Sequence, residues 1–293
     1  MEKVTLRVPA STSNLGPGFD CLGVALRVYN HIIVIRTSER HRHPRIVQEA
    51  ARAFFTRVRT RKFPFSCKID GDVPRSRGLG GSATIRLGIL HGLNTLCRSP
   101  LDRSAIFGLA AQLEKHPDNA APCSFGGFTV VRGENVQRFP VSPRLCFVLL
   151  IPELEVDTSQ ARKILPANLR RIDAMQNCAN ACAITAAFAS RNYENLRGAF
   201  ADWFHQPFRT RLVPFLSRVI AAGEKAGALG VFLSGSGSSI CAVTLRNPRI
   251  IADAMQHAVG STPSRILITQ ADNEGVQIKR RIPDIEHRRG QQA

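Results

Sequence analysis

The sequence has no apolar run long enough to cross a membrane. Its longest apolar stretches, residues 145–151 and an alanine-rich segment around Cys182, fall well short of the roughly 20 residues that a spanning helix needs. The first residues are charged and then alternate, so they lack the continuous apolar core of a secretion signal. We therefore expect no membrane partner, and we expect the protein to stay in the cytoplasm.

None of the eight cysteines forms the Cys-x-x-Cys spacing that is typical of zinc and redox sites. They are spread along the chain, mostly within apolar segments, at positions 21, 67, 97, 123, 146, 178, 182 and 241. Because the sequence has no export signal, we expect reduced thiols that are buried in the core rather than disulfides.

Acidic residues are scarce relative to basic ones. The chain has 40 Lys and Arg against 22 Asp and Glu, a formal net charge of +18. The excess is partly clustered, at residues 57–62, 279–281 and 288–289. Such clusters are usually solvated surface, but they also suit a nucleotide, a nucleic acid or an anionic membrane. The charge alone does not choose between these ligands.

The remaining composition is that of a globular protein. With 44% apolar and 21% charged residues over 293 positions, the chain has room for about two domains. Alternating apolar residues predict strands at 4–8 and 65–69, and helical spacing after residue 85 predicts a helix. Turn-forming residues predict a loop over 9–20, and the segment over 114–122 is polar. We expect a boundary near residue 140 and disorder after Arg280.

The same patterns predict a mixture of helices and strands along the whole chain. Further helices are expected at 46–58, 103–113, 172–189, 212–226 and 249–259, and further strands at 32–35, 125–131, 145–151, 231–233, 240–245 and 265–269. This mixture favours an α+β architecture.

A glycine-rich loop, PRSRGLGGSAT, lies between the strand at 65–69 and the helix that follows it. Backbone N–H groups without Cβ crowding, at the start of a helix, form an anion site that suits phosphate. The loop is neither a Walker A nor a Rossmann pattern, because no Lys-Ser or Lys-Thr follows its glycines. Arg75 and Arg77 add positive charge, and Ser82 could cap the helix or reach a metal. The alternative is a simple turn.

The segment EKHPDN concentrates acid, imidazole and amide groups in six residues. Glu114 and Asp118 could divide the roles of Mg²⁺ ligand and proton acceptor. Alternatively, His116 and Asn119 satisfy backbone groups in a loop that ends a helix. Four other polar residues are ordinary turn or surface residues when taken singly: Asn14, Asp20, Arg162 and Arg209.

Together these segments resemble the GHMP kinase superfamily, and within it the homoserine kinases. The first motif of the superfamily is similar to VPASTSNLGPGFDCLGVAL, its ATP-binding motif to PRSRGLGGSAT, and its C-terminal glycine motif to FLSGSGSSICAV. Three further segments are similar to those that distinguish homoserine kinases, namely KHPDNAAPCSFGG, DTSQARKILP and HQPFRTRLVP. The six segments follow the family order from Val8 to Val243.

The resemblance implies an α+β fold with GHMP kinase architecture. An N-terminal ATP-binding domain over residues 1–140, like domain 2 of ribosomal protein S5, would precede a ferredoxin-like domain over residues 141–293. The implied reaction uses ATP and Mg²⁺ to phosphorylate L-homoserine to O-phospho-L-homoserine, in threonine biosynthesis. By analogy with the family we expect a homodimer and no nucleic-acid partner.

The resemblance also assigns roles to residues. The ATP phosphates would be held by Arg75, Ser76, Arg77, Gly78, Leu79, Gly80, Gly81, Ser82, Ala83 and Thr84, and Mg²⁺ by Ser82 and Glu114. The homoserine pocket would consist of Asn14, Asp20, His116, Asn119, Thr158, Arg162 and Arg209. Two arginines suit the carboxylate of an amino acid, and Asp20 suits its ammonium group.

Three residues would take part in the transfer itself, namely Asn119, Asp118 and Arg209. Asp118 occupies the place where related kinases have a catalytic base, whereas homoserine kinases are thought to work without one. A loose phosphoryl-transfer transition state needs mainly alignment and charge neutralisation. We therefore expect Asn119 to position the hydroxyl for direct transfer.

Two other functions fit parts of the sequence. A kinase of this superfamily could phosphorylate another small alcohol, such as a mevalonate-like one, although two arginines favour an amino-acid carboxylate. A non-catalytic descendant of the fold could bind nucleic acid through its basic surface. No interleaving of aromatic and basic residues supports that second alternative.

Overall fold

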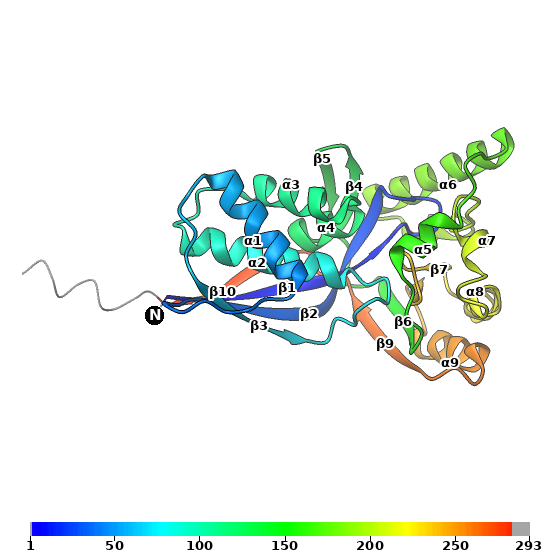
Figure 1. The fold of residues 1–293 in the computed structure, drawn as a ribbon. Helices are drawn as coiled ribbons and strands as arrows, with labels where there is room; N and C mark the ends of the chain where they lie inside the picture. Colours follow the sequence, from blue (N-terminus) through cyan, green and yellow to red (C-terminus); the bar gives the residue numbers. More distant parts are fainter. Residues whose placement is uncertain (1, 283–293) are drawn as a thin grey trace, which may run out of the picture.

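Two antiparallel sheets, each covered by helices, make up the part of the chain that the computed structural model describes, residues 2–282 (Figure 1). The first sheet has the order β10-β1-β2-β4-β5, with β3 also paired to β2. Its strands are β1 (Lys3–Ser13), β2 (Leu22–Arg36), β3 (Phe65–Gly71), β4 (Phe128–Arg132), β5 (Asn135–Phe139) and β10 (Gln277–Ile282). The second sheet has the order β7-β8-β6-β9 and consists of β6 (Cys146–Pro152), β7 (Gly230–Leu233), β8 (Ile240–Thr244) and β9 (Ser264–Gln270). The expected α+β class is confirmed.

Strand β1 is longer than the sequence pattern predicts. Val4, Leu6 and Val8 alternate into the core as expected, but the strand continues through Ser13. The loop predicted to start at Pro9 is therefore wrong in its first part. A register shift between Pro9 and Ala10 lets the chain keep pairing with β2 beyond the proline.

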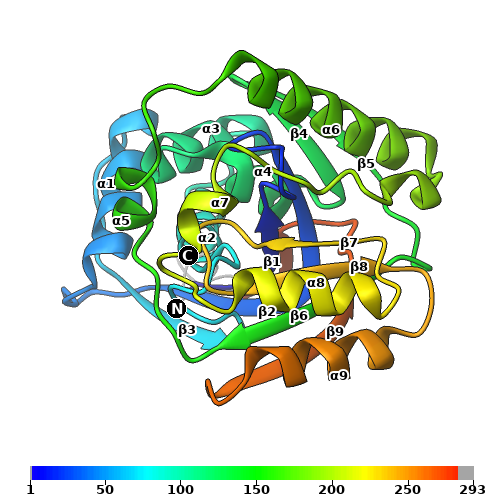
Figure 2. The same ribbon diagram turned by 90° about the vertical axis from the view of Figure 1, so that its right-hand side faces the viewer.

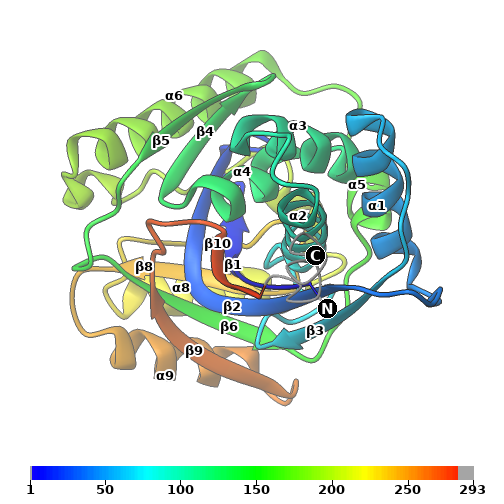
Figure 3. The ribbon, with the colours of Figure 1, turned by 90° about the vertical axis from the view of Figure 1, so that its left-hand side faces the viewer.

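Four helices cover one face of the first sheet (Figure 3). They are α1 (Arg45–Val58), α2 (Gly81–Leu96), α3 (Arg103–Glu114) and α4 (Pro117–Phe125). Helix α4 was not expected, because its first turn is polar. Pro117 occupies the first turn, where a missing N–H costs nothing, and Ala120, Ala121 and Cys123 are buried behind it.

Strand β6 separates two cores, which explains why residues 145–151 are apolar without interruption. Val148 and Leu150 pack against the helices α8 (Leu216–Lys225) and α9 (Pro248–Val259). Phe147 and Leu149 point to the opposite face, into a core shared with β2 and β4. A strand that is buried on both faces has no polar side to show. This strand therefore joins the two halves of the molecule through its apolar side chains.

The remaining helices belong to the C-terminal half of the chain, and two of them, α6 (Arg171–Ser190) and the 3-10 helix η1 (Tyr193–Leu196), pack against that shared core (Figure 2). Helix α6 contributes Phe188, which stacks on Phe128 with ring centroids 4.2 Å apart. Three short helices complete the C-terminal half, α5 (Thr158–Lys163), η1 and α7 (Gln206–Arg209).

The chain returns to the first sheet at its C-terminal end. Residues 277–282 form β10, which pairs antiparallel with β1. The expected disorder after Arg280 is thus wrong for residues 281–282, and the remainder of that prediction lies outside the described residues. The division at residues 140 and 141 stays a prediction, with the added observation that β10 belongs to the sheet of the N-terminal half.

The cysteines follow the sequence prediction only in part. All eight are free, and Cys123 and Cys241 are buried as expected. Cys178 and Cys182 are exposed on α6, so the prediction that the thiols are buried is wrong for this pair. Within residues 2–282, no helix is long and apolar enough to cross a membrane.

Candidate active site

A cavity of about 530 Å³ is lined by residues from both halves of the chain. The loop between β1 and β2, the glycine loop before α2, the first turn of α4, helices α5 and α7, and the turn between β7 and β8 all contribute to it. Every residue assigned above to ATP, Mg²⁺ or homoserine lines this cavity except Ala83 and Thr84. Both of these are fully buried in α2, and the Thr84 hydroxyl bonds to Asn30 and the Gly81 carbonyl instead.

The glycine loop ends where α2 begins. Gly80 lies just before the helix with φ +68°, and a Cβ at this position would lie 2.3 Å from the Ser11 hydroxyl. Only glycine fits there. Gly80, Gly81 and Ser82 line the cavity, so helix α2, whose first N–H groups have no partner within the helix, begins at the cavity wall. Helix N-termini of this kind attract anions.

A second glycine turn, Ser234 to Gly237 between β7 and β8, packs directly against the first. The Ser234 hydroxyl donates to the Gly78 carbonyl at 2.7 Å, and a Cβ on Gly78 would lie 2.0 Å from the Ser234 carbonyl oxygen. Gly78 has φ +71°, so a side chain would be strained there as well as crowded. The shape of the glycine loop thus depends on a turn more than 150 residues away.

The side chains of the glycine loop are less tightly held than its backbone. Arg75 and Ser76 are exposed, whereas Arg77 donates to the Pro152 carbonyl at 2.8 Å and pairs with Glu155 at 3.2 Å. Arg77 therefore links the loop to the C-terminal half, and Arg75 is available to a ligand in the cavity.

Ser82 and Glu114, the two residues assigned to Mg²⁺, meet in the cavity. The Ser82 hydroxyl donates to a Glu114 carboxylate oxygen at 2.7 Å. A hydroxyl beside a carboxylate is the kind of oxygen pair that suits a hard divalent cation. The other Glu114 oxygen forms an ion pair with Arg86, which also contacts Glu49 at 3.2 Å. The negative charge of Glu114 is consequently shared with an arginine that the sequence did not single out.

The charged residues assigned to the acceptor contact one another in the same cavity. Asp20 forms an ion pair with Arg162, and His116 Nδ1 lies 3.8 Å from the same carboxylate. Burial and the charge of Arg162 lower the pKa of His116, while Asp20 opposes them. His116 is therefore a neutral hydrogen-bonding group near pH 7.

Arg162 and Arg209 both lie close to the ring of Phe19. Their guanidinium carbons lie 5.1 and 5.4 Å from the centroid of Phe19. Burial, and then the charge of Arg162, lower the pKa of Arg209 to about 10. Arg209 remains charged at neutral pH, so two positive groups line the cavity together with Asp20. This arrangement complements a small molecule with one anionic and one cationic group.

Asn14 lines the cavity, but the protein already uses its side chain. Its amide donates to the Gly235 carbonyl at 3.0 Å, and its oxygen accepts the backbone N–H of Asp20 at 3.0 Å. Asn14 and Asp20 both have positive φ, 68° and 61°. Asn and Asp tolerate this conformation better than other residues with a Cβ. Asn14 thus shapes the loop that presents Asp20.

Asn119 lines the cavity from the first turn of α4. Its oxygen accepts from the Ser11 hydroxyl at 2.9 Å, and its nitrogen donates to the Ser13 hydroxyl at 2.9 Å. Each atom retains capacity for one more hydrogen bond. The side chain therefore has a fixed orientation next to Gly80, where a phosphoryl group and a hydroxyl could meet.

Asp118, the neighbour of Asn119, is 3% exposed, and its Oδ1 has no hydrogen-bond partner among the described residues. Burial, reinforced by the charge of Asp20, raises the pKa of this carboxyl to about 6. Thr158, at the start of α5, lies with its hydroxyl 3.2 Å from that of Ser236. Both residues line the cavity.

Sequence reasoning missed several residues of the cavity. Ser13, Phe19 and Ser236 lie within segments that resemble family motifs, but no role was assigned to any of the three. Arg86 follows the glycine loop by a few positions, but no pattern in the sequence relates it to Glu114. The apolar wall beside the loop was also missed; it consists of Pro44, Ile46, Ile69, Ile85 and Leu113.

Comparison with known proteins identifies similar chains of nearly the same length. The family model of the GHMP kinases N terminal domain matches residues 45–127, and that of the GHMP kinases C terminal matches residues 167–261. Homoserine kinase of Caldicellulosiruptor bescii is 35% identical over 94% of this chain and 96% of its own length. Homoserine kinase of Moorella thermoacetica is 36% identical over 84% and 89% of the two chains.

Solved structures resemble the fold as well. The crystal structure of homoserine kinase from Cytophaga hutchinsonii has a TM-score of 0.87 and 24% identity, covering 94% of this chain and 97% of that one. The mevalonate kinase of Methanococcus jannaschii has a TM-score of 0.69 and 15% identity, covering 91% and 97%. At these identities the likeness concerns the fold alone.

Proposed function

The chain belongs to the homoserine kinases of the GHMP kinase family, and from this premise we propose that its cleft transfers the γ-phosphoryl group of ATP to the hydroxyl of L-homoserine. The product is O-phospho-L-homoserine, and the reaction belongs to amino-acid biosynthesis. One observation supports this assignment above the others. A helix N-terminus suited to phosphate and a cluster suited to a zwitterion, Asp20 with Arg162 and Arg209, line one cavity.

In this proposal ATP occupies the end of the cavity formed by the glycine loop. The N–H groups at the start of α2 bind the phosphates, and Arg75 adds positive charge. The apolar wall that includes Ile46, Ile69 and Leu113 receives the base. Ser82 and Glu114 would hold Mg²⁺, which when bound neutralises part of the charge on the phosphates.

L-Homoserine occupies the other end. Its ammonium group binds Asp20, and its carboxylate binds Arg162 and Arg209. Because Asp20 and Arg162 pair with each other in the free protein, the incoming zwitterion exchanges one ion pair for two. Neutral His116 adds a hydrogen bond without adding charge. A cytoplasmic location and a homodimeric state remain our predictions from the sequence and from the family analogy.

The acceptor hydroxyl then lies near Asn119 and Asp118, below the glycine loop. Asn119 is held by two serines and can bind the hydroxyl in a fixed position. Transfer to the hydroxyl needs mainly in-line alignment, so we propose that Asn119 positions the acceptor and that Asp118 is not an obligatory base.

A panel of acceptors tests this function. ADP release would be measured with L-homoserine, with mevalonate, with 3-aminopropan-1-ol, which lacks the carboxylate, and with 4-hydroxybutyrate, which lacks the ammonium group. We expect the highest kcat/KM with L-homoserine and large losses with both truncated analogues. Equal or better turnover of mevalonate would contradict the assignment of the acceptor. Absence of ADP release, together with tight, salt-sensitive RNA binding, would favour a nucleic-acid-binding descendant.

A further inference from the structure

The guanidinium of Arg209 is held by three acceptors from three segments of the chain. Nε donates to the Ala161 carbonyl at 3.2 Å, and Nη1 donates to the Gly235 carbonyl at 2.9 Å and to Nδ1 of His205 at 3.2 Å. The residue is 1% exposed. Within residues 2–282 no acceptor contacts Nη2, so this is the nitrogen left for a ligand in the cavity.

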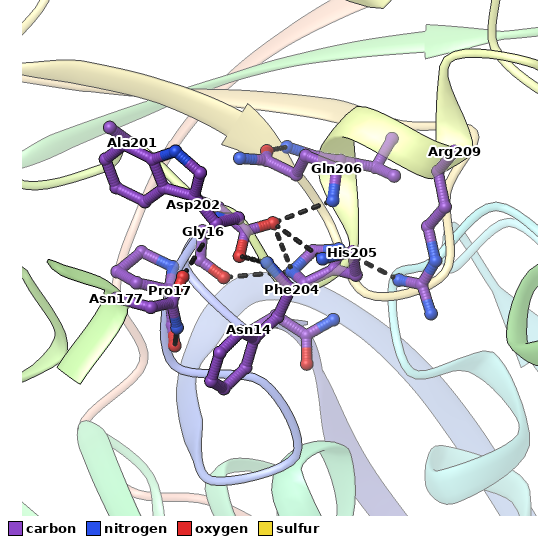
Figure 4. Close-up of polar contacts among 12 residues, drawn as sticks. Asn14, Gly16, Pro17, Asn177, Ala201, Asp202, Phe204, His205, Gln206 and Arg209 are labelled. Atoms are coloured by element: carbon purple, nitrogen blue, oxygen red, sulfur yellow. Dashed lines mark hydrogen bonds and ion pairs between the residues drawn. The ribbon is translucent and has the colours of Figure 1, made fainter. Parts of the chain in front are cut away.

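The contact with Arg209 fixes the tautomer of His205. A guanidinium can only donate hydrogen bonds, so Nδ1 must accept and the ring proton must lie on Nε2. Nε2 lies 2.9 Å from the Gly16 carbonyl and donates to it (Figure 4). Burial and the charge of Arg209 lower the pKa of His205 to about 3, so the ring stays neutral. One imidazole therefore joins Arg209 to the loop between β1 and β2.

Asp202, Arg209 and Arg162 contribute the charges around this ring. The Asp202 carboxylate lies 3.4 Å from Nε2, and the charge of Arg162 lowers the pKa of His205 less than the charge of Arg209 does. Asp202 also accepts the backbone N–H groups of Phe204, His205 and Gln206, at 2.7 to 3.1 Å (Figure 4). This carboxylate therefore fixes the backbone that carries the histidine.

Gly16, which accepts the hydrogen bond from His205, belongs to the loop that also carries Asp20. Gly16 has φ +71°, and a Cβ there would lie 2.4 Å from the Phe200 carbonyl oxygen. Asn177 of α6 donates to the next carbonyl, that of Pro17, at 2.7 Å (Figure 4). The loop is thus a rigid element rather than a mobile one, and a hydrogen bond to Gly16 constrains Asp20 a few residues further along.

We propose that His205 is a positioning residue that sets the spacing between the two groups which bind the charged ends of the acceptor. Its Nδ1 fixes Arg209 for the carboxylate, and its Nε2 fixes the Gly16 loop, and so Asp20, for the ammonium group. The proposal rests on the proposed function, because it takes a zwitterionic acceptor as given. His205 itself need not touch the acceptor.

Two conservative substitutions separate the two halves of this role. The amide of asparagine superposes on the position of Nδ1 and the amide of glutamine on that of Nε2. His205→Asn therefore keeps the acceptor for Arg209 and loses the donor to Gly16, whereas His205→Gln does the reverse. His205→Phe removes both contacts and keeps a ring of similar size beside Phe19, whose centroid lies 5.1 Å away.

The measurement compares kcat/KM for L-homoserine with that for each truncated analogue, in the wild type and the three variants. In His205→Gln we expect the preference for homoserine over 3-aminopropan-1-ol to fall roughly tenfold, because of these two acceptors only homoserine has a carboxylate for Arg209. In His205→Asn we expect the preference over 4-hydroxybutyrate to fall instead. KM for ATP should stay within about twofold in both, and His205→Phe should lose both preferences.

A purely structural role gives another pattern. If both variants lowered turnover of all three acceptors in the same proportion, and did so in parallel with a lower melting temperature, the positioning role would be refuted. The ratios are internal to each variant, so partial unfolding does not imitate the expected result. A wild type that phosphorylates none of the acceptors would instead refute the proposed function, and the role of His205 with it.

Discussion

The two ends of the cavity are built in opposite ways. At the acceptor end, Arg209, Asp118 and Asn14 are at most 3% exposed, and protein groups fix the orientation of Arg209 and Asn14. At the phosphate end, Ser76, Ser82 and Arg75 are exposed, and the backbone provides most of the recognition. A small acceptor offers little binding energy, so its partners must already be in place. A triphosphate brings several charges and can order the exposed side chains itself.

Substitution of Arg209 should have the largest effect on activity, because this residue is the most buried charged group among those assigned to the acceptor. We expect Arg209→Met to lower kcat/KM for L-homoserine by about 100-fold to 1000-fold, because truncating a buried, hydrogen-bonded charge costs on the order of 3 kcal/mol. KM for ATP should change little. Steady-state kinetics with each substrate varied in turn would measure both. An equal loss for ATP would mean that the two ends are not separate.

The second prediction concerns the folding stability that is lost because the Asp118 carboxyl is buried. The pKa of its carboxyl, raised to about 6, means that the folded protein keeps this proton where the unfolded chain has lost it. Stability should therefore fall as the pH rises from about 4 to about 6. In Asp118→Asn this fall should be absent, and the variant should be more stable above pH 6 by up to ~3 kcal/mol. Urea unfolding at several pH values would measure it.

The same substitution tests the chemistry. Direct transfer predicts that Asp118→Asn and Asp118→Ala keep kcat within about 10-fold of the wild type, whereas loss of a general base would cost roughly 10²-fold to 10⁴-fold. The fold of each variant would be checked by circular dichroism. A collapse of kcat in both folded variants would establish Asp118 as a base.

Third, the backbone dependence of the phosphate end can be tested at Gly78. Gly78→Ala adds a Cβ 2.0 Å from the Ser234 carbonyl oxygen at positive φ, so the loop must move. We expect a loss of stability on the order of 2 kcal/mol and weaker binding of ATP. Gly108→Ala is the control, because nothing lies within 4 Å of a Cβ there and α3 should become slightly more stable. Calorimetry would compare the two variants.

The smallest effect is expected on the binding of Mg²⁺ with nucleotide, when the cation that pairs with Glu114 is removed. Arg86→Met removes the cation that pairs with this carboxylate, so binding of Mg²⁺ with a non-hydrolysable ATP analogue should tighten by a few-fold. Arg45→Met is the matched control, because Arg45 is 92% exposed and its one ion pair among residues 2–282 is with Glu49. Titration calorimetry would detect the difference. Weaker binding in Arg86→Met would indicate that Arg86 contacts the phosphates.

The sequence predicted those parts of the molecule that depend on neighbours along the chain. Strands such as β3 and helices such as α1 and α3 have regular apolar patterns, and the family and its kinase activity are confirmed by the comparisons. Helix α4 and the end of β1 were missed, because prolines and polar residues dominate their local sequence while long-range pairing and burial stabilise them.

The chemistry of the site was predictable by type but not by arrangement. The motifs correctly indicated which segments line the cavity, since the predicted residues other than Ala83 and Thr84 meet there. No local pattern could show that the Asn14 side chain hydrogen-bonds to the backbone of Asp20 and Gly235. Nor could it show that His205 connects Arg209 with Gly16. Such contacts join residues up to more than 200 positions apart, so only the fold defines them.

The contact between the two glycine turns has a consequence for recombining this protein with its relatives. A chimaera could take the residues up to β5 from one kinase and the remainder from another. Its Gly78 and its Ser234 would then come from two different proteins. The two glycine turns that contact each other beside the phosphate site would then come from different parents, although the splice point is far from both turns in the sequence. Productive hybrids should therefore inherit both turns from the same source.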